Sequence, residues 1–143
     1  MCLRVWDDAA VVQVADEDID CYKVLTRHDE SPYRHMPYKA GELVTSELDK
    51  GVRPVDSDGE PYGFREYHIG LHTFIFSSEA EYEARDWSMV GMAVWHAVIP
   101  KGSRYIVGDF AGDKSYVSDA LMLVKKIGSF NGFHDERQLD TEV

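Results

Sequence analysis

Two segments of this acidic chain carry the side chains best suited to bind an anion. Segment 21–40 contains four Lys or Arg residues against two acids, and segment 101–126 contains five against three, so each has a net charge of +2. Tyr33 and Tyr38 accompany the first segment. Because cations pair with phosphate and aromatic rings stack on bases, this pattern favours a nucleotide-like ligand where the two segments meet. The alternative is a set of solvated surface charges. The cations predicted to bind are Lys23, Arg27, Lys101 and Arg104.

Two histidines, His68 and His72, are spaced four residues apart. A helix would place them on one face, where they could chelate a metal ion. The surrounding pattern is that of a strand, in which four residues span about 13 Å. One ion cannot be reached from both rings by short ligand bonds, so no metal site is predicted. His72, beside Gly70, is interpreted either as a ligand contact or as a partly buried histidine bonded to the backbone.

The two cysteines make neither a disulfide framework nor a zinc site on their own. Cys2 would become the N-terminal residue if Met1 were removed, and its α-amino group could then act as a base. This is the arrangement of amide-cleaving N-terminal nucleophile enzymes. The alternative is a small apolar residue that opens the first strand. Cys21 lies in an apolar segment and is expected in the core.

The overall charge excludes some partners and suggests another. The 143 residues contain 26 Asp and Glu against 15 Lys and Arg, a net charge of −11. Nucleic acids and anionic membranes both attract Lys and Arg, so neither is expected to be bound directly. Segment 1–20 holds six acids and one base, which motivates an alternative function, an acidic inhibitor that imitates nucleic acid. Without an apparent signal peptide or membrane-length apolar run, we expect a cytoplasmic protein, and no cofactor is predicted.

One helix is well signalled and is predicted over residues 79–89. Ser78 and Glu81 fit a capping box, and acidic residues near the start complement the helix dipole. An apolar stripe at helical spacing predicts the buried face, and it consists of Ala80, Ala84 and Trp87.

The rest of the pattern is typical of short strands, and the fold class predicted is α+β. A single domain, 1–143, would hold a mixed or antiparallel sheet of six to eight short strands and the one helix. The longest predicted strand covers 66–76, where Gly70 indicates a bulge or a close approach by another backbone or a ligand. Residues 48–63 are predicted to form a surface loop, and residues 132–143 a polar tail.

Several stretches resemble a family of short bacterial and phage proteins: MCLRVW, IDCYKVLTR, GLHTF, HAVIPKGSRYIVG and SYVSDALMLVKKI. This resemblance covers most of the chain and implies no particular activity.

A more distant similarity is to the ADP-ribosyltransferase fold. In CYKVL, Lys23 stands where that family has Arg, and in GLHTF, His72 and Thr73 stand at its Ser-Thr pair. In VSDALML, Asp119 stands where the catalytic Glu would be. Lys in place of Arg loses bidentate recognition, and Asp in place of Glu shortens the reach of the carboxylate. The resemblance therefore implies a degenerate nucleotide pocket that includes Asp119, with ADP-ribosyl transfer as an alternative.

The sequence as a whole predicts a non-enzymatic binding protein. Its partner would be an anionic, nucleotide-like small molecule or another protein, and its oligomeric state is left open. The site residues predicted are Lys23, Arg27, His72, Lys101, Arg104 and Asp119.

Overall fold

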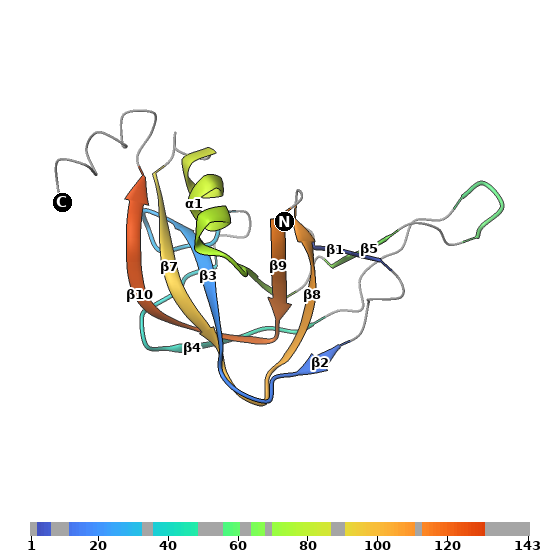
Figure 1. The fold of residues 1–143 in the computed structure, drawn as a ribbon, viewed down its shortest axis with the longest axis horizontal. Coiled ribbons are helices and arrows are strands. Elements are labelled where there is room, and N and C mark those ends of the chain that lie inside the picture. Colours follow the sequence, from blue (N-terminus) through green and yellow to red (C-terminus); the bar gives the residue numbers. More distant parts are fainter. Residues whose placement is uncertain are drawn as a thin grey trace.

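The structure is a computed structural model that describes residues 3–6, 12–32, 36–48, 56–60, 64–67, 70–86, 91–110 and 113–130. These ranges contain ten strands and one helix (Figure 1). The elements are β1 (Leu3–Trp6), β2 (Gln13–Val14), β3 (Ile19–Thr26), β4 (Leu43–Thr45), β5 (Phe64–Tyr67), β6 (Leu71–Phe74), α1 (Ser77–Asp86), β7 (Met92–Ile99), β8 (Arg104–Phe110), β9 (Asp113–Ser118) and β10 (Ala120–Phe130).

The predicted α+β class with six to eight strands is wrong, because the described chain is mostly one antiparallel sheet. The strand order is β4-β10-β7-β3-β6-β9-β8-β1-β5, and β2 pairs with β8. Short strands such as β2 and β4 span too few residues for a period of two to show in the sequence. The ends of β8 and β9, at residues 108–110 and 113–115, pair with each other.

The sheet closes on itself through one residue of backbone. β9 ends at Ser118 and β10 begins at Ala120, so Asp119 alone separates them. Pairing runs from β9 through β6, β3 and β7 to β10, and the chain itself then joins β10 back to β9. Figure 1 shows the result as a trough, with β3, β7 and β10 on one side and β8 and β9 on the other.

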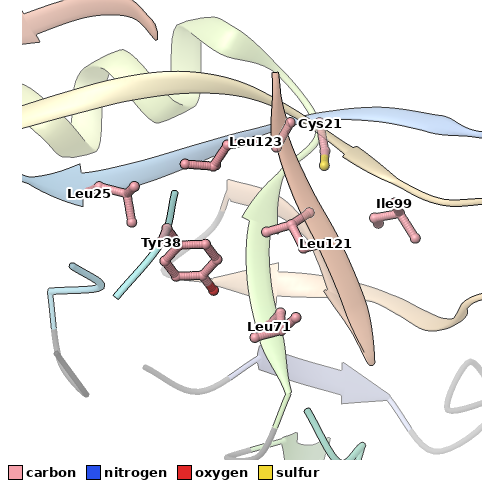
Figure 2. Close-up of a cluster of buried hydrophobic side chains, with 8 residues drawn as sticks. Cys21, Leu25, Tyr38, Leu71, Ile99, Leu121 and Leu123 are labelled. Carbon is pink, nitrogen blue, oxygen red and sulfur yellow. The ribbon is translucent and has the colours of Figure 1, made fainter. Parts of the chain in front are cut away.

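The trough is filled by the larger of two apolar clusters, contributed by β3, β6, β7, β10 and the segment before β4 (Figure 2). Its buried members are Cys21, Leu25, Tyr38, Leu71, Ala97, Ile99, Leu121 and Leu123. Along β3, the side chains that point into the trough alternate with Tyr22 and Val24. These two residues point to the opposite face and belong to the second apolar cluster, which lies under α1. Each leucine buried in this way contributes roughly 1.5–3 kcal/mol of stability.

The helix covers the outer face of β3 and β7. It begins at Ser77, two residues before the predicted start, so Ser78 lies within the first turn rather than at the N-cap. Ala80 and Ala84 are fully buried against Val24 and Phe74, which confirms these two positions of the predicted stripe. Trp87 lies outside the described residues. In the part of the chain that is described, no helix has the length and apolar character to span a bilayer.

The segment predicted as one long strand, 66–76, is divided between β5 and β6. Gly70 stands just before β6 with φ at 142° and comes so close to β9 that a Cβ there would clash with the Val117 side chain. The close contact at this glycine is therefore with a side chain, and not with the backbone or ligand that the sequence predicted. Residues 56–60 of the predicted loop are exposed, and Asp56 accepts hydrogen bonds from the amides of Asp58 and Glu60. The predicted tail, 132–143, lies outside the described residues.

Replacing Gly70 by alanine should lower the free energy of unfolding by roughly 2–5 kcal/mol, because the new methyl group overpacks against Val117 and the positive φ is strained. Urea unfolding curves measure the loss. Gly59→Ala is the matched control, since Gly59 also has a positive φ (80°) but no atom within 4 Å of the added carbon. Its cost should be only about 1–2 kcal/mol. Equal losses in the two variants would contradict the packing argument.

Candidate functional site

A groove of about 450 Å³ lies beside β4, at the end of the trough where β7 turns into β8. Three parts of the chain form its wall: β4 with the residue that follows it, the turn at 100–103, and the junction between β9 and β10. The lining residues are Leu43, Thr45, Ser46, Pro100, Lys101, Gly102, Ser103, Asp119 and Ala120.

The turn at 100–103 is held in place by its backbone. The Gly102 amide donates to Ala15 O at 2.8 Å, and the Lys101 amide donates to Asp18 Oδ1 at the same distance. The Ser103 amide donates to Pro100 O at 3.0 Å, which closes the turn. These amides already have hydrogen-bond partners. A ligand at the turn would therefore contact side chains, namely the exposed Lys101 ammonium and the Ser103 hydroxyl.

Asp119 ties three strands together at the floor of the groove. Its Oδ1 accepts the Arg104 amide at 2.9 Å, and its own amide donates to Arg104 O at 3.0 Å. Its carbonyl accepts the Ser46 amide at 2.9 Å, which fixes the end of β4. One carboxylate oxygen therefore orients the side chain, and a carboxylate has further lone pairs with which to accept a ligand hydroxyl.

A second group of functional side chains lies in the interior, around Lys23. This residue is 5% exposed, and its Nζ donates to His72 O at 2.6 Å and lies 5.3 Å from the centre of the Tyr38 ring. His72 is also buried, with its ring edge-on to Phe74. The Thr73 hydroxyl lies beside the Cys21 thiol on the inner face.

Burial controls the protonation of these interior groups. It lowers the pKa of Lys23 to about 8, and it raises the pKa of the Cys21 thiol to about 12. Burial, together with the Lys23 charge, holds the pKa of His72 well below its usual range. Burial also raises the pKa of Tyr38. At neutral pH Lys23 is therefore a cation, and the other three of these groups are neutral.

The structure brings the six predicted site residues together in two groups and leaves one apart. Lys101 and Asp119 line the groove, with Arg104 bonded to Asp119 through its backbone. Lys23 and His72 meet in the interior. Arg27 is exposed just beyond the end of β3 that is remote from the groove, and a strand of eight residues extends roughly 25 Å.

The two basic segments do not line one groove in the part of the chain that is described. No residue of segment 21–40 is among those around the groove, whereas segment 101–126 supplies five of them. Cys2, Tyr33 and His68 lie outside the described residues, so the hypotheses that rest on them stay predictions.

Sequence reasoning missed the hydroxyl residues of the groove, Thr45, Ser46 and Ser103. No motif marks them, because they come from separate elements that meet only through the Asp119 junction. It also missed Trp95, which stands opposite Lys23 in the pairing of β3 with β7. The apolar run of β7 gave no sign that this indole faces a buried cation.

No protein-family model matches the chain, and no curated protein or solved structure was found to match it.

The lowered pKa of Lys23 should make stability rise with pH just above neutrality. Between pH 8 and 10.5 the unfolded chain binds more protons at this lysine than the folded protein does, so the free energy of unfolding increases there. From pH 8 to 9 Lys23 alone should add about 1 kcal/mol, and Cys21 should offset part of this gain because its thiol, with an ordinary pKa of 9.0, begins to ionise in the unfolded chain but not in the folded one. Denaturant unfolding at low ionic strength measures it.

Lys23→Met should abolish this rise, whereas Lys39→Met, at a lysine whose side chain is 79% exposed, should preserve it. The same rise in Lys23→Met as in the unsubstituted protein would show that another group is responsible.

Proposed function

We propose that the protein is a non-enzymatic binding protein that takes a small, phosphate-bearing, nucleotide-like ligand in the groove beside β4. The observation that carries the proposal is the set of groups around this groove. Lys101, Asp119 and three hydroxyl residues, drawn from three parts of the chain, surround one opening of about 450 Å³. This volume is within the range usual for small-molecule sites.

Each group has a part to play in binding such a ligand. Lys101 would pair with the phosphate, and the Ser103 and Thr45 hydroxyls could donate hydrogen bonds to its oxygens. Asp119 would accept a sugar hydroxyl, while its bond from the Arg104 amide keeps the carboxylate in place. Leu43 and Pro100 offer apolar surface for a base.

The charge around the groove favours one phosphate over several. Lys101 is the cation in the wall, and Arg104 follows closely in the chain. The acidic Asp18 lies behind the same turn, and the whole chain carries −11. A polyphosphate would bring more negative charge than these cations can offset. A nucleoside monophosphate fits the balance better.

Titration calorimetry with a panel of nucleoside mono-, di- and triphosphates tests the proposal. A monophosphate should bind most tightly, and Lys101→Ala should weaken its binding by roughly 10- to 100-fold, because a charge-assisted hydrogen bond is lost. Lys125→Ala, which removes an exposed charge on β10 away from the groove wall, is the matched control and should bind normally.

No binding by any member of the panel would refute the nucleotide assignment. Binding that Lys101→Ala leaves unchanged would refute the groove as its site.

A further inference from the structure

The Lys23 ammonium is buried, and no carboxylate of the described residues is buried with it. Among the described residues that are buried, the polar and charged ones are Lys23, His72, Thr73, Ser103, Ser115 and Ser118, and none is Asp or Glu. An ammonium group has three hydrogens to donate, and one bond, to His72 O, is present here. A buried charge ordinarily needs a partner of opposite sign or a full set of hydrogen bonds.

The neighbouring protein groups do not supply that opposite charge. Burial raises the pKa of Cys21 to about 12 and also raises those of Tyr38 and Tyr116, so all three stay protonated at neutral pH. His72 presents its carbonyl oxygen to the ammonium, and Tyr38 presents the face of its ring. Both interactions stabilise the ammonium group, but neither supplies a negative charge to compensate it.

Two further donors lie on either side of Lys23. Trp95 stands directly opposite it on β7, and the indole Nε1 is buried with no hydrogen-bond partner. On the other side, Tyr22 pairs with Phe74, a register that brings Thr73 of β6 alongside Lys23. Thr73 is fully buried, and its Oγ1 makes no hydrogen bond of ordinary geometry. Thr73, Lys23 and Trp95 thus stand in a row across three adjacent strands.

The positive charge of this row extends to the rim of the sheet. Lys126 stands opposite Trp95 on β10, and its Nζ lies 5.4 Å from the centre of the Trp95 ring. Lys126 is exposed, so it can be solvated and needs no counter-ion. It adds to a potential that attracts anions toward the buried ammonium.

We propose that Lys23, Trp95 and Thr73 together hold a small monovalent anion inside the trough. All three groups can donate hydrogen bonds, which suits an anion. The anion would in turn compensate the charge of the buried Lys23 ammonium. The anion must be small because the larger apolar cluster, which includes Leu25 and Tyr38, packs in the same trough. It must be monovalent because a second negative charge would have no buried partner. A halide and a short carboxylate share this chemistry. The site is separate from the groove and does not depend on its function.

Thermal unfolding at pH 7.5 in sodium chloride, bromide or formate, against sodium sulfate at equal ionic strength, tests the proposal. A bound anion should raise the Tm of the unsubstituted protein by roughly 5–10 °C at 100 times its dissociation constant. A response to both halides but not to formate identifies a halide site, and a response to formate alone identifies a carboxylate site. Equal Tm values in all four salts would overturn the proposal.

Three variants locate the effect. Lys23→Met should lose the anion response, and Trp95→Phe, which keeps a ring but removes the indole N–H, should reduce it. Lys101→Ala, in the groove, should keep it, so the two proposals can fail separately. An anion response of full size in both Lys23→Met and Trp95→Phe would show an effect of salt elsewhere on the protein and would overturn the site.

Crystals grown in sodium bromide give a direct test that does not require the Lys23 variant to fold. The anomalous signal of bromide should appear within hydrogen-bond reach of Lys23 Nζ. For a carboxylate-selective site, formate density should appear there instead. Density for neither at that position would refute the proposal.

Discussion

The rest of the structure depends on the single residue that separates β9 from β10. Asp119 lets one stretch of chain pair with β6 and β8 before the junction and with β4 and β7 after it. The antiparallel sheet therefore folds over and encloses its apolar side chains. The Asp119 carboxylate bonds to the Arg104 amide and its carbonyl bonds to the Ser46 amide, so the same residue that turns the chain also builds the floor of the groove.

The interior combines a close-packed apolar cluster with a polar row that includes a cation. Burial removes Lys23 from water, which lowers its pKa and strengthens the interactions that its ammonium group makes. Burying an ammonium group costs more free energy than burying a methionine in the same place. We therefore expect Lys23 to have a role beyond packing. His72 and Tyr38 support the cation, and the buried polar atoms of Trp95 and Thr73 on the two neighbouring strands are the further donors of the proposed anion site.

The two places differ in the kind of recognition they allow. The groove is open, is bounded by side chains from three parts of the chain, and mixes one cation with one carboxylate, so it suits a ligand with a phosphate and a hydroxyl-bearing sugar. The polar atoms of the interior row are buried and can all donate hydrogen bonds, so the row suits the small anion proposed for it. The strong negative net charge of the chain weakens attraction to any anion at long range, and both sites must therefore rely on local contacts.

The sequence alone determined local features whose signals lie close together in the chain, as the buried alanines of α1 show. It also singled out Lys101, Asp119, Lys23 and His72 as residues of chemical interest. Only the tertiary structure decided that Lys101 and Asp119 share a groove while Lys23 points into the core and Arg27 lies far away. The same is true of the number of strands. The reason is that pairing between distant strands sets both outcomes, and a one-dimensional pattern of residue types does not record which strands will pair.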